Sequence, residues 1–157
     1  MSVVTIREFQ PGDEGSFRQL NEEWIRRYFR MEKKDEESLL DPQGTILDAG
    51  GRIFFAFTGE ECVGCCALLR LAADEFEVAK MAVAPNSRGS GIGRQLLCAV
   101  IEAARTAGTR RLCLETNHAL EPAIRLYHSV GFQTLPAGRF VPSPYARSDV
   151  QMEMILV

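Results

Sequence analysis

Short apolar runs and two helical stretches alternate in the first half of the chain. Apolar side chains from Phe17 to Tyr28 recur at the spacing of one helix face, which predicts a helix over residues 13–30. The charged run 32–37 predicts the start of a short second helix whose charges face solvent. Turn residues separate the β-prone runs, so we predict strands over residues 3–9, 52–58, 62–71 and 76–83, with the second and third forming a hairpin.

The second half has longer helical periodicity. Apolar positions from Ile92 to Ala104 predict a helix over residues 91–107. The remaining predicted elements are a strand over 111–115, a helix over 120–130 that ends at Gly131, and a closing strand over 151–156. Strands that alternate with helices imply at least one parallel pair joined by a right-handed crossover. No linker or repeat interrupts the pattern, so we expect residues 1–157 to form a single domain.

Composition and charge narrow the class of protein. The chain is 46% hydrophobic and 25% charged, with a net charge of −3, so we expect no nucleic-acid partner. The charge is unevenly distributed, because residues 1–87 carry −6, residues 88–111 carry +4 and residues 112–157 carry −1. A short basic segment therefore lies within an acidic chain.

The sequence gives little indication of a membrane-spanning segment, a disulfide or a metal site. No apolar stretch approaches the roughly 18 residues that span a bilayer, and the first residues lack a leader pattern, so we expect a cytoplasmic protein with no membrane partner. The five cysteines are odd in number, and the pair Cys62 and Cys65 has no second pair, which favours structural thiols. His118 and His128 lack partners at ligand spacing, so we expect no metal.

A glycine-rich turn lies between a predicted strand and the helix that follows it. Residues 88–94 read Arg-Gly-Ser-Gly-Ile-Gly-Arg. Glycines allow close approach to backbone N–H groups, and a helix N-terminus attracts anions, so the turn suits a phosphate or pyrophosphate. A P-loop would need Gly-Lys, and a dinucleotide fingerprint beginning at Gly89 would need glycine where Arg94 stands. These differences disfavour an ATPase or a dehydrogenase.

Two sequence blocks have the spacing of a known family's motifs. Arg88, Gly91 and Gly93 fit the pattern (Arg/Gln)-x-x-Gly-x-(Gly/Ala), after a strand over residues 77–83 of the type Glu-x-x-Lys-Met-x-Val. Residues 123–132 fit Ala-x-x-Leu-Tyr-x-x-x-Gly-Phe. The chain thus resembles the GNAT superfamily of acyl-coenzyme A dependent N-acetyltransferases. The resemblance implies an α+β fold, with a mixed, mostly antiparallel central sheet of about six to seven strands and about four flanking helices.

The resemblance also implies acetyl-coenzyme A as cosubstrate. Its pyrophosphate would lie on the glycine-rich turn, and its pantetheine arm would pair with the strand before it. Many relatives carry Asn where this chain has Leu120, and Asn117 is the candidate replacement. The implied coenzyme A contacts are Met81, Ala82, Val83, Arg88, Gly89, Ser90, Gly91, Ile92, Gly93, Arg94, Asn117 and Tyr127.

For the chemistry, the resemblance implies direct attack by a primary amine of a small molecule or peptide, without an acyl-enzyme. Tyr127 stands where relatives place the residue that protonates the thiolate, and Glu77 where many place the carboxylate that takes the amine proton. The alternatives are a core position for Tyr127 and an exposed strand end for Glu77. We expect a backbone N–H in residues 81–83 to meet the oxyanion, since splayed strands leave donors unpaired.

Substrate contacts are expected from the variable parts of the chain. Candidates are Trp24 and Tyr28 on the first helix, which would otherwise be core residues, and Tyr145 and Arg147 in a proline-rich loop. Arg147 could bind a carboxylate or phosphate of the substrate. The alternative function is a non-catalytic acyl-coenzyme A binding or regulatory module of the same fold. The chain would be a monomer, or a homodimer paired through its closing strand.

Overall fold

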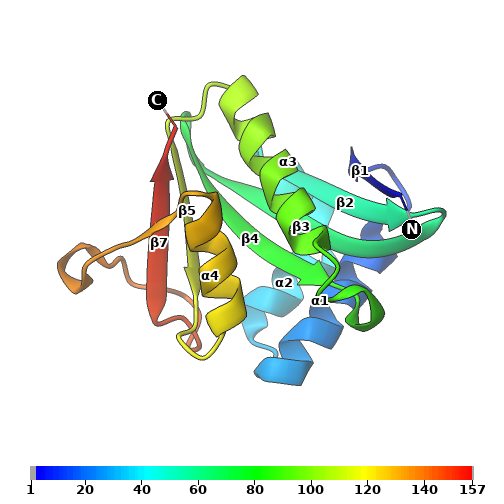
Figure 1. Ribbon diagram of the computed structural model, residues 1–157, viewed down its shortest axis with the longest axis horizontal. Helices are drawn as coiled ribbons and strands as arrows, with labels where there is room; N and C mark the ends of the chain where they lie inside the picture. Colours follow the sequence, from blue (N-terminus) through cyan, green and yellow to red (C-terminus); the bar gives the residue numbers. More distant parts are fainter. Residues whose placement is uncertain (1–2, 157) are drawn as a thin grey trace.

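One seven-stranded sheet organises the molecule (Figure 1). The structure is a computed structural model that describes residues 3–156. The strand order is β1-β2-β3-β4-β5-β7-β6, and every pair is antiparallel except the parallel pair β4 and β5. The strands are β1 (Val4–Glu8), β2 (Arg52–Thr58), β3 (Glu61–Ala72), β4 (Glu75–Val83), β5 (Arg111–Thr116), β6 (Gln133–Thr134) and β7 (Val150–Ile155).

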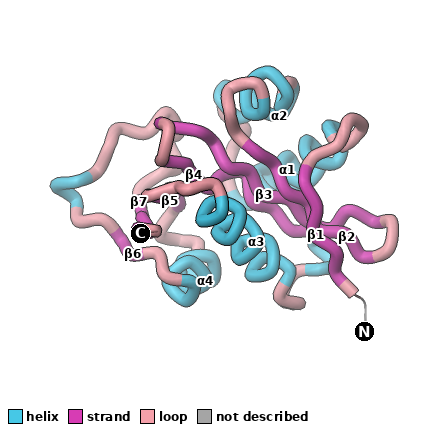
Figure 2. Tube along the Cα trace, turned by 90° about the horizontal axis from the view of Figure 1, so that it is seen from above, coloured by secondary structure: helices cyan, strands magenta, loops and turns pink. Residues whose placement is uncertain are grey.

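Helices cover both faces of the sheet, with α1 and α2 on one face and α3 and α4 on the other (Figures 1 and 2). Within residues 3–156 the four α-helices are α1 (Glu14–Tyr28), α2 (Lys33–Leu40), α3 (Ile92–Thr106) and α4 (Glu121–Val130). A short π-helix, Gln43–Leu47, follows α2. None of the helices in this range is both long and apolar enough to cross a membrane.

Each face of the sheet has its own hydrophobic core. Along β2, Phe54 and Ala56 belong to the core under α3, whereas Ile53 and Phe55 belong to the core under α1 and α2. This alternation follows from the period of two residues in a strand. A side chain at Gly64 of β3 would place its Cβ 2.8 Å from the Leu96 side chain, so the glycine allows α3 to lie directly against the sheet.

The parallel pair β4 and β5 separates along its length. The two strands pair only from Glu75 to Glu77 of β4, opposite Arg111 to Cys113 of β5. Beyond Glu77 the edge of β4 that faces β5 has no strand partner among the described residues. In the same part of β4 the pairing with β3 is irregular, and Lys80 has a φ of +52°. The separation opens a cleft between the two strands, where the candidate site lies.

The predicted elements agree closely with this architecture. The α+β class, the number of strands and the parallel pair are confirmed, and the bounds of the main helices and strands differ from those predicted by at most two residues. The sequence did not indicate β6 or the π-helix. The expectation that the charged run 32–37 faces solvent is wrong at Asp35, whose side chain is fully buried because Lys80 and Arg147 bind it.

Candidate active site

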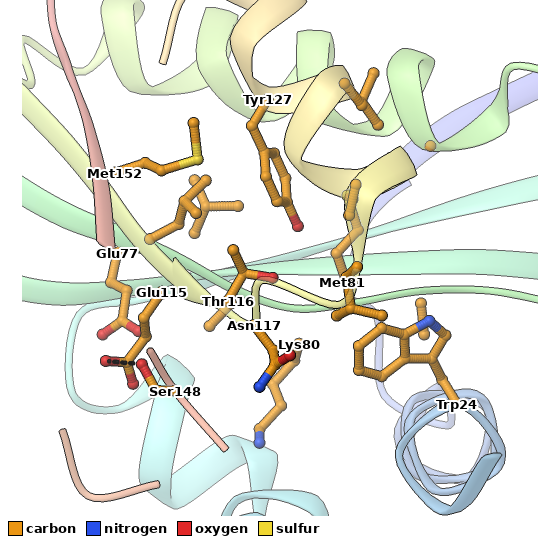
Figure 3. Close-up of a pocket in the computed structure, with 18 of the residues that line it drawn as sticks. Trp24, Glu77, Lys80, Met81, Glu115, Thr116, Asn117, Tyr127, Ser148 and Met152 are labelled. Carbon is orange, nitrogen blue, oxygen red and sulfur yellow. Dashed lines mark hydrogen bonds between the residues drawn. The ribbon is translucent and has the colours of Figure 1, made fainter. Parts of the chain in front are cut away.

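A cavity of about 730 Å³ lies where β4 and β5 separate (Figure 3). Its walls come from β4, β5, α1, α4, the glycine-rich turn and the loop before β7. Tyr127 points into it from α4, Trp24 lies on the α1 side, and Glu77 and Glu115 lie together at one end. The cavity therefore brings together residues that are far apart in the chain, such as Trp24 and Tyr127.

Tyr127 presents its hydroxyl to this cavity. Its ring packs edge-to-face on Phe132, with the ring centroids 6.1 Å apart. Burial raises the pKa of the phenol above its ordinary value of 10, so the hydroxyl stays protonated near neutral pH. The side chain contributes to the core through its ring and to the cavity through its hydroxyl. The core position therefore describes the ring of Tyr127, and its role as the proton donor to the thiolate stays a prediction.

Glu77 is the last residue of β4 that pairs with β5. Its side chain is partly buried at the cavity wall, unlike that of an exposed strand-end glutamate. Burial is the main cause that raises its pKa from 4.5 to about 7; the nearby charge of Glu115 adds to the rise and Lys80 opposes it. A carboxylate with a pKa near neutrality can accept a proton at physiological pH.

Glu115 is a cavity residue that the sequence did not reveal. Glu77 pairs with Cys113, and Glu115 is two residues further along β5, so all three side chains lie on one face of the sheet. The hydroxyls of Ser143 and Ser148 donate to its carboxylate at 2.8 and 3.2 Å. Only the register of β4 against β5 places Glu115 beside Glu77, and no local pattern encodes that register.

The glycine-rich turn adopts a conformation that requires glycine at two positions. Gly89 and Gly91 have φ values of +81° and +85°, and a Cβ at either would meet nothing within 4 Å. Glycine is therefore needed at these two positions for the left-handed backbone conformation and not to avoid a steric clash. At Gly93, with no positive φ, a Cβ would make only ordinary contacts, at 3.6 Å from Leu126 and 3.9 Å from Val83. The fold itself does not require this third glycine, and its missing side chain leaves the first turn of α3 open.

The two arginines of the turn bind protein groups. Arg88 donates to the Val83 carbonyl at 3.0 Å and to the Glu23 carboxylate at 2.7 Å. Arg94 donates to the Ser129 hydroxyl at 2.5 Å. The backbone N–H groups at the start of α3 are therefore the more accessible anion donors, and Arg88 in addition ties the turn to α1.

Three of the remaining sequence candidates lie at the cavity with their polar groups bound internally. The Asn117 amide donates to the Arg147 carbonyl and accepts from the Ala119 N–H, both at 2.8 Å. Arg147 donates to both Asp35 oxygens, at 2.7 and 2.6 Å. The Tyr145 hydroxyl accepts a hydrogen bond from the ammonium of Lys80 at 3.2 Å. The expectation that Arg147 binds a substrate anion is disfavoured, because its guanidinium is already bound to Asp35 and, at 3.3 Å, to Glu32.

The aromatic candidates on α1 also face the cavity. Trp24 and Tyr28 both line it, with ring centroids 5.3 Å apart. Tyr28 is 46% exposed, so it is not a core residue. Residues 3–156 hold no cluster of three or more His, Cys, Asp or Glu side chains suited to a metal, and Cys62, Cys65, Cys66, Cys98 and Cys113 are all free.

Comparison with known proteins identifies the family of the chain. The model of the Acetyltransferase (GNAT) family matches residues 17–132. The IAA acetyltransferase of Azospirillum brasilense is 35% identical over 146 residues, which cover 92% of this chain and 94% of that protein. An uncharacterized N-acetyltransferase, YsnE of Bacillus subtilis, is 39% identical over 80 residues, and the match spans 50% of this chain and about half, 53%, of that protein.

Solved structures show the same fold. A GNAT-family acetyltransferase from Staphylococcus aureus Mu50 superposes with a TM-score of 0.88 at 20% identity, over 99% of this chain and 100% of that one. The N-acetylglutamate synthase of Neisseria gonorrhoeae, solved with coenzyme A and N-acetyl-glutamate, gives 0.72 at 23% identity over 100% of this chain and 36% of that one. The family match, the relatives and the fold agree, and this chain belongs to the GNAT family of N-acetyltransferases.

Proposed function

We propose that this protein transfers an acetyl group from acetyl-coenzyme A to a primary amine of a small molecule or peptide, by direct attack of the amine. The observation that carries the proposal is that Glu77 and Tyr127 face one cavity, whose wall continues into the glycine-rich turn at the start of α3. This arrangement offers a proton acceptor and a proton donor beside a site suited to a pyrophosphate.

Acetyl-coenzyme A fits the residues of the turn. Two glycines hold the left-handed backbone, and the absence of a side chain at Gly93 leaves the N–H groups of the first turn of α3 accessible. These amides, within residues 88–94, would hold the pyrophosphate, and the unpaired edge of β4 at residues 81–83 would bind the pantetheine arm. The coenzyme A in the related N-acetylglutamate synthase supports this assignment. When bound, acetyl-coenzyme A supplies the activated acetyl thioester.

Glu77 acts on the amine in this proposal. An amine attacks only when it is neutral, and a carboxylate whose pKa is about 7 takes up its proton near neutral pH. A backbone N–H within residues 81–83 donates to the oxygen that becomes negative during attack, because the edge of β4 that faces β5 has no strand partner there. Both groups belong to β4, so one strand places the base and the oxyanion donor.

Tyr127 acts on the departing sulfur. Its phenol stays protonated, because burial raises its pKa, and it therefore donates a hydrogen bond to the developing thiolate. Trp24 and Tyr28 contribute an apolar wall to the substrate side. The net charge of −6 in residues 1–87 favours an approaching cationic amine.

Two measurements test the proposal. Acetyl-coenzyme A should raise the midpoint of thermal unfolding, whereas ATP and NAD should not, since only a ligand that binds the native state stabilises it. Release of free thiol should then follow addition of an amine from a panel. Tyr127→Phe should keep the affinity for coenzyme A and lower turnover. Binding without thiol release across the panel would contradict catalysis and favour a non-catalytic acyl-coenzyme A module.

A further inference from the structure

Two of the buried polar side chains in the described part of the chain converge on one residue. Buried polar or charged residues there are Asn21, Asp35 and Thr109. Asn21, on α1, donates to the Cys65 sulfur at 3.3 Å, and the Cys65 thiol donates to the Lys80 carbonyl at 3.4 Å. Asp35, on α2, binds the Lys80 ammonium at 2.5 Å. The Lys80 backbone is therefore held by Cys65 of β3, which Asn21 of α1 supports, and the Lys80 side chain is held by Asp35 of α2.

The backbone of Lys80 needs such support. Its φ of +52° is the only positive value at a non-glycine residue among residues 3–156. A residue with a long side chain disfavours this left-handed conformation, which persists where the surroundings hold it. The ladder between β3 and β4 is irregular here, since Cys65 pairs with Ala82 and Ala67 with Ala79. Lys80 thus belongs to a bulge in β4.

The network around Lys80 is buried and fully paired. The Lys80 and Asp35 side chains are 6% and 0% exposed. Asp35 also accepts two hydrogen bonds from Arg147, which lies in the loop before β7. Burial raises the pKa of Cys65, which therefore remains a thiol able to donate. Removal of a member of such a network leaves its partners unsatisfied, so the geometry of the bulge depends on the whole set.

The bulge lies directly before the backbone that faces the cavity. Residues 81–83 follow Lys80, and their edge toward β5 has no strand partner. On the opposite edge Ala82 and Val83 still pair with Cys65 and Gly64 of β3, so the direction of these amides is set by that ladder together with the dihedral angles at Lys80. A displacement of about 1 Å in such donors is enough to lower a reaction rate greatly.

We propose that the buried network formed by Asn21, Cys65, Lys80 and Asp35 holds the bulge of β4 and thereby aims the backbone amides of residues 81–83 at the acyl oxygen. Lys80, Cys65 and Asp35 are positioning residues in this arrangement, because they act through the backbone and not on the substrate. The inference rests on the proposed function for its catalytic consequence. The network itself is a property of the free protein.

Comparison of Lys80→Ala with Lys80→Gly separates the effect of the backbone conformation at residue 80 from the effect of losing the ammonium charge. Both variants remove the ammonium, but glycine adopts positive φ readily and alanine does not. We expect Lys80→Ala to lower kcat at least tenfold, since removal of an oxyanion donor costs about 10²–10³-fold. We expect Lys80→Gly to be at least threefold more active than Lys80→Ala. Equal activity in the two variants, or wild-type kcat in Lys80→Ala, would overturn the proposal.

Cys65 offers a second matched pair. Cys65→Ser keeps a hydroxyl that donates to the Lys80 carbonyl, whereas Cys65→Ala removes the donor. We expect kcat of the serine variant to lie closer to wild type than that of the alanine variant. Cys62→Ala is the control for loss of a thiol on the same strand, because the Cys62 sulfur donates to the Gly64 carbonyl and not to the bulge. Equal kcat in Cys65→Ser and Cys65→Ala would contradict the role of the thiol.

Amide hydrogen exchange in the free protein tests the network without a measurement of enzyme activity. In Lys80→Ala, the amides of residues 79–83 should exchange at least tenfold faster, while those between β5 and β7 keep their wild-type rates. Unchanged exchange at residues 79–83 would overturn the proposal. If the wild-type protein showed no acetyl transfer with any amine, the proposed function would fail, and the exchange rates would still decide whether the network holds the bulge.

Discussion

Replacement of Glu77 by glutamine should change both the stability and the activity of the protein in a pH-dependent way. The carboxyl has a pKa of about 7 in the folded protein against an ordinary value of 4.5. This difference corresponds to about 3 kcal/mol, at 1.36 kcal/mol per pH unit. Its main cause, burial, and its second cause, the charge of Glu115, both penalise the ionised form.

The sign of the effect follows from the protons that each state binds. Between pH 4.5 and 7 the folded protein keeps a proton on Glu77 that the unfolded chain has lost, so the free energy of unfolding falls as pH rises through this window. Glutamine has no charge to bury. We therefore expect Glu77→Gln to match wild type in stability at pH 4.5 and to exceed it by up to about 3 kcal/mol at pH 8.

Urea denaturation of both proteins at pH 4.5 and pH 8 measures this difference directly, and the pH profile of kcat/KM measures the catalytic role. Wild-type kcat/KM should rise with pH through an apparent pKa near 7, and Glu77→Gln should lack that rise and have much lower activity. A stability difference that is the same at both pH values would refute the raised pKa. An unchanged pH profile in Glu77→Gln would refute its role as the base.

Three further predictions concern neighbouring parts of the site. Glu115→Gln should move the rise in wild-type kcat/KM to lower pH, because one of the causes that raise the pKa of Glu77 is removed; an unmoved profile would contradict this coupling. Gly91→Ala should lower the free energy of unfolding by about 1–2 kcal/mol in urea denaturation, since φ is +85° and no clash occurs; wild-type stability would count against a conformational role. Arg147→Met should cost about 2 kcal/mol in the same assay, because Asp35 loses two charged hydrogen bonds; a loss below about 0.5 kcal/mol would show that Lys80 alone suffices.

Local sequence patterns predicted the parts of the site that belong to single elements. Tyr127 lies on a helix with clear periodicity, and the segment 88–94 carries its own glycines and the start of α3. These features depend on backbone conformation over a few residues, so their chemistry is visible in one stretch of sequence. The parallel pair was predicted for the same reason, since a strand, a helix and a strand in succession restrict the topology.

Other residues of the site could not be predicted from local patterns. Asp35 lies in a run of six charged residues that resembles a solvated surface, yet Lys80 and Arg147, 45 and 112 positions away, bury it. Glu115 resembles any polar residue near a strand end until the register of β4 against β5 places it beside Glu77. Arg147 was a candidate for binding a carboxylate or phosphate of the substrate, and only the packed loop shows its guanidinium bound to Asp35.

The sequence by itself determined the family, the order of the elements, the glycine-rich turn and the positions of Glu77 and Tyr127, because each depends on residues close together in the chain. The tertiary structure alone decided the burial of Asp35, the placement of Glu115 beside Glu77, and the bulge at Lys80. These features arise from strand register and from contacts between distant segments, where the free energy of a charged side chain depends on its neighbours in space rather than in sequence.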